Sequence, residues 1–150
     1  QTMQTKTKQN EKKYLVRNLQ TYQNDNYKRI RKNLRRFLGG MNKDQLDLIN
    51  AASQEMIRVD GQWINNRKAL IEKLKLILKR DDGWELALTN ITHRDDLVSA
   101  NYRKTYSHNI KVNERLFVEI LNSRTEKQDK KLRSMLLRYK TDINNLIDQK

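Results

Sequence analysis

Residues 36–46, RFLGGMNKDQL, contain the clearest helix boundary in this sequence. The two glycines predict the end of a helix, because glycine adopts the left-handed conformation beyond a helical C-terminus at little cost. Asn42 then stands three residues before Gln45, which is the spacing of a capping box, where each side chain bonds the other residue's backbone N–H. A second helix is therefore expected to begin directly after the first.

A similar turn occurs near the end of the chain, where residues 124–128 read RTEKQ. Thr125 and Gln128 have the same spacing and predict another capping box at the start of a last helix. The apolar face expected for that helix consists of Leu132, Leu136, Tyr139, Ile143 and Leu146. The repetition is explained either by two independent N-caps or by two similar helical hairpins.

The composition favours long helices. The 150 residues include no proline, no cysteine and four glycines, whereas an average chain of this length has roughly 7 prolines and 10 glycines. No segment alternates in the manner of a strand. We expect an all-α fold, an antiparallel bundle of about four long helices plus one short helix, with residues 12–150 forming a single helical domain after a flexible N-terminal stub at residues 1–11.

Apolar residues at helical spacing place the individual elements. One helix is expected over residues 12–38, and a second from residue 42 to about residue 78, with Gly61 marking a bend or a close contact inside it. A short helix carries Trp84, and another long helix covers about residues 96–121. Acidic pairs precede these two helices, at Asp81 and Asp82 and at Asp95 and Asp96, where they complement the positive end of a helix dipole.

The charge is strongly positive, with 32 Lys and Arg against 18 Asp and Glu and a net charge of +14. Residues 1–40 hold 11 basic and 2 acidic side chains, so the excess is concentrated there. Such a cluster suits phosphate, anionic lipid or an acidic polypeptide, and it also describes a solvated helix face. The candidate partner-binding residues are Lys28, Arg29, Arg31, Lys32, Arg35 and Arg36.

Catalytic and metal motifs are missing from the sequence. His93 and His108 are 15 residues apart, and without cysteine a zinc site would need carboxylates from distant helices. There is no GxSxG nucleophile turn, phosphate loop or dinucleotide fingerprint, and no recognisable nucleic-acid-binding module. We therefore expect no enzyme activity, no catalytic or cofactor-binding residues, no cofactor and no metal.

A group of polar residues interrupts the apolar stripes. Asp60 and Arg67 are seven residues apart and share a helix face with Trp63. We expect a polar layer in which Arg67 is held by Asp60 or by tyrosine and asparagine oxygens. This layer either fixes the register of the helices or forms a small groove for a peptide or polar ligand. Its members are Asp60, Trp63, Asn66, Arg67, Tyr102, Tyr106, Asn109 and Asn113.

Several motifs together resemble a family of uncharacterised proteobacterial lipoproteins, over roughly residues 30–145. Its members show a W/F-L-G-x-L-x-x-x-Q junction, a W-x-x-N-R helix motif and an L-N-S-L-T-x-x-Q turn. The matching segments here are residues 36–45, 63–67 and 121–128, together with residues 102–109 and Tyr139. Met41 and Arg124 stand where leucine is commoner in that family.

This resemblance implies a periplasmic protein of the cell envelope with no established activity. In its full-length form such a protein is made with a signal peptide and anchored through an acylated cysteine, so this chain looks like the C-terminal part of a longer lipoprotein. Membrane attachment would come only through that anchor, which is absent from this chain. The two capping turns also look like the L-T-x-x-Q turns of small periplasmic stress chaperones.

The sequence thus predicts a non-enzymatic envelope protein that binds other proteins, anionic lipid or another polyanion through its basic helix, as a chaperone-like or scaffold protein. The alternative is a cytoplasmic nucleic-acid-associated helical protein, which the charge alone supports. Apolar residues at Leu15, Leu19 and Tyr22 suit self-association into a homo-oligomer or packing onto further N-terminal helices.

Overall fold

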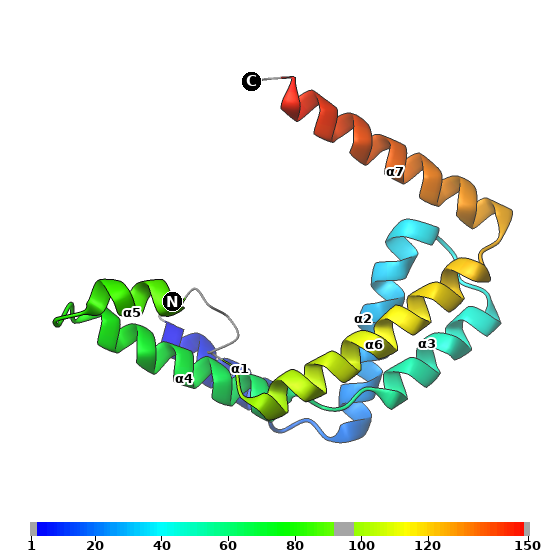
Figure 1. The fold of residues 1–150 in the computed structure, drawn as a ribbon. Coiled ribbons are helices and arrows are strands. Elements are labelled where there is room, and N and C mark those ends of the chain that lie inside the picture. The colour runs from blue at the N-terminus through cyan, green and yellow to red at the C-terminus, as the bar shows by residue number, and fades with distance from the viewer. Residues whose placement is uncertain (1–2, 92–97, 149–150) are drawn as a thin grey trace. The chain divides into compact units, whose positions relative to one another are not determined.

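A computed structural model describes residues 3–91 and 98–148 of the chain. These residues form seven helices and no strand, which confirms the all-α prediction (Figure 1). None of the described helices has an apolar stretch of the length that a bilayer crossing requires. The helices are α1 (Met3–Tyr14), α2 (Leu19–Leu38), α3 (Lys43–Glu55), α4 (Asp60–Leu78), α5 (Trp84–Ile91), α6 (Ala100–Asn122) and α7 (Glu126–Ile147).

The chain divides into two compact units. Unit 1 comprises residues 1–22 and 57–110, and unit 2 comprises residues 23–56 and 111–150. The boundaries between the units therefore fall inside α2, between α3 and α4, and inside α6. Sequence patterns could not show this division, because each unit combines segments that are distant along the chain.

The prediction of a stub at residues 1–11 followed by one helix over residues 12–38 was wrong. The structure has a first helix, α1, which ends at Tyr14, and a second helix, α2, which begins at Leu19. The polar α1 packs on α4, where the Tyr14 and Trp63 rings meet edge to face at 5.9 Å. Asn18 starts α2, since its side-chain oxygen accepts the backbone N–H of Thr21 at 2.8 Å.

The predicted helix from residue 42 to residue 78 is also divided, into α3 and α4. Met56 takes an extended conformation at the end of α3, with φ −64° and ψ 129°. The side-chain amide of Asn109 then binds the next residue twice, accepting from the Ile57 N–H at 2.9 Å and donating to its carbonyl at 2.8 Å. These bonds replace the helical partners of Ile57, so the break falls before Gly61, which lies in the first turn of α4.

The other predicted helix boundaries agree more closely with those of the structure. The short helix is present as α5, beginning at Trp84, and α7 begins directly after Thr125, as predicted. The helix expected from about residue 96 begins at Ala100. Three residues to which the sequence analysis gave a place, His93, Asp95 and Asp96, lie outside the described part of the chain.

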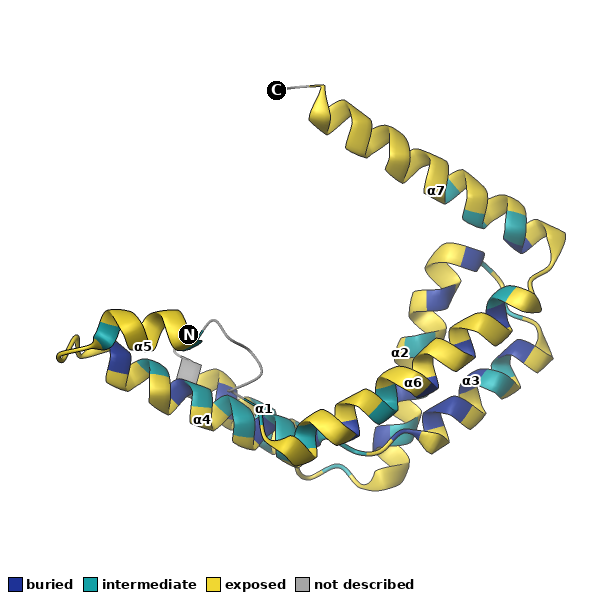
Figure 2. Cartoon of the chain, in the orientation of Figure 1, coloured by how far each residue is buried: buried dark blue, intermediate teal, exposed yellow. Residues whose placement is uncertain are grey.

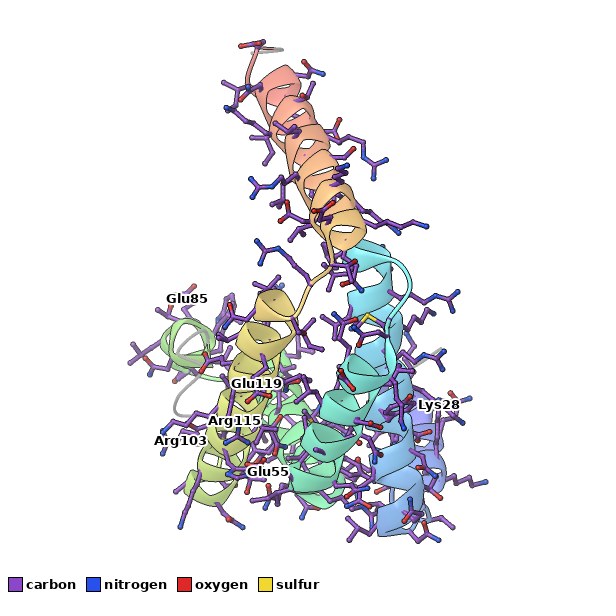
Figure 3. The ribbon with its side chains drawn as sticks, turned by 90° about the vertical axis from the view of Figure 1, so that its right-hand side faces the viewer. Lys28, Glu55, Glu85, Arg103, Arg115 and Glu119 are labelled. Carbon is purple, nitrogen blue, oxygen red and sulfur yellow. The ribbon has the colours of Figure 1, made fainter. Side chains whose placement is uncertain are left out.

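The buried apolar residues differ between the two units. Those of unit 1 are Tyr22, Ile64, Ile71 and Ile77. Those of unit 2 come from the region of α2, α3 and α6, and they are Leu34, Leu38, Ile49, Ala52, Met56, Val112, Leu116 and Ile120. An exposed ion pair between Glu55 and Arg115 also joins α3 to α6 (Figure 3). In contrast, α7 is exposed along most of its length, and its buried residue is Gln128 (Figure 2).

Candidate interaction surface on helix α2

The basic residues predicted to bind a partner lie on the C-terminal half of α2, and all six are exposed. Five of them line one surface hollow of about 400 Å³, and these are Lys28, Arg31, Lys32, Arg35 and Arg36. We call this surface the basic face. Arg29 is separate from it, because its guanidinium donates to the Asn26 side chain at 2.8 Å. Figure 3 shows Lys28 projecting outward from α2.

Helical geometry explains why these five side chains gather. Each of them lies three or four residues from another member of the set, and residues at this spacing share one side of a helix. Arg35 and Arg36 also lie in the last turn, where cations complement the negative end of the helix dipole. The acidic content of α2 is a single residue, Asp25. The basic face therefore presents several positive charges with little compensation from its own helix.

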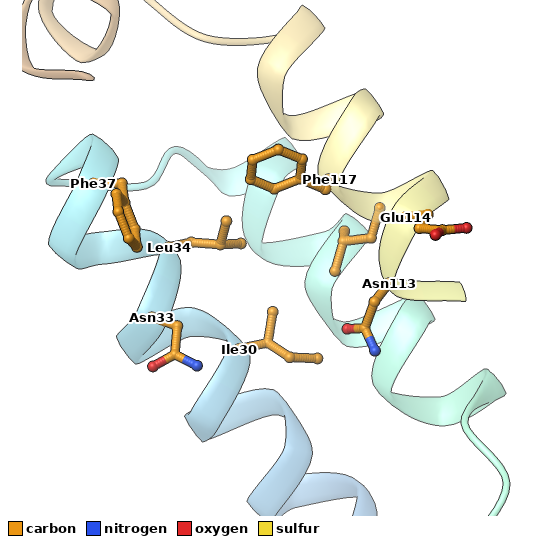
Figure 4. Close-up of a pocket in the computed structure, with 8 residues that line it drawn as sticks. Ile30, Asn33, Leu34, Phe37, Asn113, Glu114 and Phe117 are labelled. Carbon is orange, nitrogen blue, oxygen red and sulfur yellow. The ribbon is translucent and has the colours of Figure 1, made fainter. Parts of the chain in front are cut away.

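A second feature, an apolar groove, lies on another side of α2, where α2 faces α6 (Figure 4). Its volume is about 370 Å³. The Phe37 side chain on α2 is 38% exposed, and that of Phe117 on α6 is 50% exposed. The lining residues are Ile30, Asn33, Leu34, Phe37, Asn113, Glu114, Leu116 and Phe117.

Sequence reasoning missed this groove. It placed Asn113 in the polar layer, and it did not single out Phe117. On α6, Leu116 and Ile120 lie four residues apart and form a buried apolar stripe. An aromatic residue directly beside such a stripe was the available signal.

Within the predicted polar layer, Asp60 has different partners from the one expected. Asp60 is 6% exposed, and its carboxylate accepts two hydrogen bonds from Arg17, at 2.8 and 2.6 Å. Arg58 donates a third, at 2.9 Å. Burial by itself would raise the pKa of the Asp60 carboxyl, but the hydrogen bonds and positive charges of the two arginines outweigh burial and hold that pKa below its ordinary value.

Of the two partners expected for Arg67, Asp60 is thus bonded to Arg17 and Arg58 instead. The Arg67 guanidinium instead lies over the Trp63 ring, 5.9 Å from its centroid. Arg17, which bonds the carboxylate, lies in the turn between α1 and α2. Among the described residues, the Arg67 Nε atom has no hydrogen-bond partner.

The other members of the predicted layer do not form one groove. The rings of Tyr102 and Tyr106 stack on each other, with centroids 5.8 Å apart. The Asn66 side-chain oxygen accepts from the Ser99 N–H at 3.4 Å. Asn109 binds Ile57 in unit 1, as described above, whereas Asn113 lines the apolar groove of unit 2. The eight residues thus serve several separate contacts.

The predicted helix caps are confirmed. Asn42 with Gln45 and Thr125 with Gln128 each form a complete capping box. The two boxes also contact each other, because the Gln45 and Gln128 side chains exchange hydrogen bonds. Gly39 has the left-handed φ of 87° expected after the end of α2. This junction also joins the segment after α2 to the segment after α6, because Gln128 donates to the Gly40 carbonyl and Gln45 donates to the Ser123 carbonyl.

Comparison with known proteins adds one finding. Residues 1–103 match the Family of unknown function (DUF6279), and this range includes all of α2 and the WINNR segment at residues 63–67. The match ends before the turn at Thr125, whereas the motif resemblance extended to about residue 145. No curated protein and no solved structure matches the chain. Because the matched range is more than half of the chain, this protein belongs to the Family of unknown function (DUF6279).

Proposed function

We propose that this protein is a non-enzymatic helical protein of the cell envelope that binds other proteins or anionic surfaces through α2. The observation that carries the proposal is the basic face, where five exposed cationic side chains from one helix line a common hollow. A concentrated positive surface raises the encounter rate with polyanionic partners and holds them by screened electrostatic attraction. A chaperone-like or scaffold role fits such a surface, because it lies beside a groove that accepts apolar groups.

A non-catalytic role is supported by the state of the buried carboxylate. Asp60 is the described acidic residue with the deepest burial, and its charge is engaged by Arg17 and Arg58. A general acid or base works best with a pKa near the operating pH, and the arginines move the pKa of Asp60 in the opposite direction. Its geometry is that of a structural ion cluster.

The envelope location rests on the lipoprotein resemblance of the motifs at residues 36–45 and 63–67. It is tested by isolating the native protein from fractionated cells and determining its N-terminus by mass spectrometry. We expect an acylated cysteine upstream of Gln1 and recovery in the membrane fraction. An unprocessed methionine start in the cytosolic fraction would contradict this location.

Binding through the basic face is tested by reversing charge. The triple variant Arg31→Glu, Arg35→Glu, Arg36→Glu should lose most of its affinity for an acidic unfolded protein and for anionic lipid vesicles. The matched control is Lys130→Glu, Arg138→Glu, Lys140→Glu, which makes the same charge change at exposed positions of α7. Equal affinities for the two variants would remove the basic face from the proposal, because net charge alone would then explain binding.

The second candidate, a cytoplasmic nucleic-acid-associated protein, is favoured by the same uncompensated charge. It predicts tight binding to duplex DNA, with an affinity that falls linearly on a logarithmic scale with salt and a slope reflecting several phosphate contacts. Suppression of aggregation of an unfolded acidic protein, with weak DNA binding at physiological salt, favours the envelope protein. Measuring both activities on one preparation separates the two functions.

A further inference from the structure

The apolar groove between α2 and α6 is shaped to receive side chains from outside. Its volume of about 370 Å³ lies within the range of small-molecule and peptide-anchor sites in proteins. Phe37 on α2 and Phe117 on α6 stand on its two walls, and Leu34 and Ile30 project from α2 toward α6 (Figure 4). Half-exposed aromatic walls around an apolar floor are typical of surfaces that gain stability when a partner covers them.

The two rims of the groove carry different charges. On α2, Asn33 lines the groove. Helical spacing places Arg29 and Arg36, four residues before and three residues after it, on the row that adjoins Asn33, with Arg36 at the edge of the basic face. On α6, the charged residue at the groove is Glu114. A ligand lying along the groove would therefore meet positive charge on its α2 side and a carboxylate on its α6 side.

We propose that this groove binds an amphipathic helix of another protein, one with an apolar seam and with carboxylates on the flank that faces α2. This inference rests on the proposed function and gives the partner its chemistry. Leucine-like side chains spaced by three and four residues would enter the groove in the helix-in-groove manner. Aspartate or glutamate on one flank would pair with Arg29 and Arg36. This pairing fixes which way the bound helix runs along the groove.

The charge of the groove argues against a second copy of this chain as the occupant. Among the described helices, α7 has the largest number of exposed large apolar side chains, including Leu136, Ile143 and Leu146 at 54%, 56% and 66% exposure. Its sequence from Glu126 to Ile147 contains six basic and three acidic residues. Docking it beside Arg29 and Arg36 would bring like charges together, which is unfavourable.

The shape argues against a bilayer. A membrane surface is bound by apolar side chains that protrude into it, whereas Phe37 and Phe117 line a concave groove. Duplex DNA would leave the apolar walls uncovered, because its outer surface is phosphate and sugar. A polypeptide helix satisfies both the apolar groove and the charged rim.

The probe for this proposal is a fluorescent peptide of about 18 residues, roughly 27 Å as a helix. It carries leucines on one face, glutamates on one flank of that face and glutamines elsewhere. A second peptide has the same composition in an order that disperses the leucines around the helix. A third keeps the leucine face and replaces glutamate by lysine. Fluorescence polarisation should show binding of the first peptide, with the other two weaker by about tenfold or more.

Two variants of the protein locate the site. Phe117→Ser should weaken binding of the first peptide by about tenfold or more, whereas Val118→Ser, at a neighbouring position that is 56% exposed and does not line the groove, should not. Arg36→Glu should weaken binding, in contrast to Lys130→Glu on α7. Circular dichroism confirms that each variant keeps its helices, and the comparison of the peptides needs no variant at all.

The outcomes distinguish this inference from the proposed function. Equal binding of the first and second peptides, or no effect of Phe117→Ser, would overturn the groove while leaving charge-driven binding by the basic face intact. A wild-type dimer that Phe117→Ser converts to a monomer, or vesicle binding that depends on Phe117, would also overturn it, in favour of a second copy or a membrane. Failure of the wild-type protein to bind any acidic peptide, anionic vesicle or DNA at low salt would refute both proposals.

Discussion

The side-chain amides of Gln45 and Gln128 each donate a hydrogen bond to the other's carbonyl oxygen, at 3.0 and 2.9 Å. Each amide also binds its own helix start, since Asn42 N–H and Thr125 N–H donate to the same two oxygens. Both glutamines are buried, at 0% and 4% exposure. The starts of α3 and α7 are thus locked to each other by two interlocked capping boxes in unit 2.

This pairing predicts a strong energetic coupling between the two glutamines. Gln45→Ala or Gln128→Ala should destabilise the protein by about 1–3 kcal/mol, because each leaves buried partners unsatisfied. The double variant should cost less than the sum of the two single variants, with a coupling of about 1 kcal/mol in urea unfolding followed by circular dichroism. Gln54→Ala, at an exposed position of α3, is the control. Additive effects would show that the two boxes act independently.

The pairing is a contact that the sequence could not reveal. The three-residue spacing in each box could be recognised because it is local, and both boxes were predicted at the right residues. That the two boxes contact each other could not be predicted, since Gln45 and Gln128 are 83 residues apart and any pair of good N-caps has the same local pattern.

The helix breaks were missed for a related reason. The apolar stripe continues in phase from α3 into α4, so periodicity predicted one helix where the Asn109 side chain holds Ile57 in an extended segment. The basic face was predictable because all of its residues belong to one helix. The groove was not, since its two walls come from α2 and α6 and depend on how these helices pack.

The Asp60 cluster predicts a loss of stability in acid. Its folded-state pKa is lowered, so its contribution is complete above the ordinary aspartate pKa of about 3.9 and is lost as the pH falls through the lower folded-state value. Asp60→Asn should cost about 2 kcal/mol at pH 7, because it leaves Arg17 and Arg58 without their carboxylate. The difference from wild type should shrink below pH 4.

Thermal melting between pH 7 and pH 3 measures this effect. Asp142→Asn, at an exposed position inside α7, is the control and should leave the melting temperature close to that of wild type. A constant difference between Asp60→Asn and wild type at every pH would mean that the carboxylate charge does not carry the contribution.

Asn109 predicts a local change in dynamics. Asn109→Ala removes both hydrogen bonds to Ile57, at a cost of about 1–3 kcal/mol. Amide hydrogen exchange should then accelerate in residues 56–59, between α3 and α4, more than in the middle of α7. His108→Ala is the neighbouring control. Unchanged exchange at Ile57 would show that the segment is held by other contacts, such as the hydroxyl of Tyr22, which donates to the Ile57 carbonyl at 3.0 Å.

Two glycines predict opposite effects of the same substitution. Gly39 has a φ of 87°, and an added Cβ would lie 3.4 Å from the Lys131 side chain, so Gly39→Ala should destabilise the protein by about 1–2 kcal/mol. Gly61 lies in the first turn of α4, and nothing lies within 4 Å of its added Cβ. Gly61→Ala should therefore stabilise the protein by up to about 1 kcal/mol. Urea unfolding of both variants measures the two changes in the free energy of unfolding. A loss of stability in Gly61→Ala would indicate that the start of α4 needs a glycine for a reason other than helix propensity.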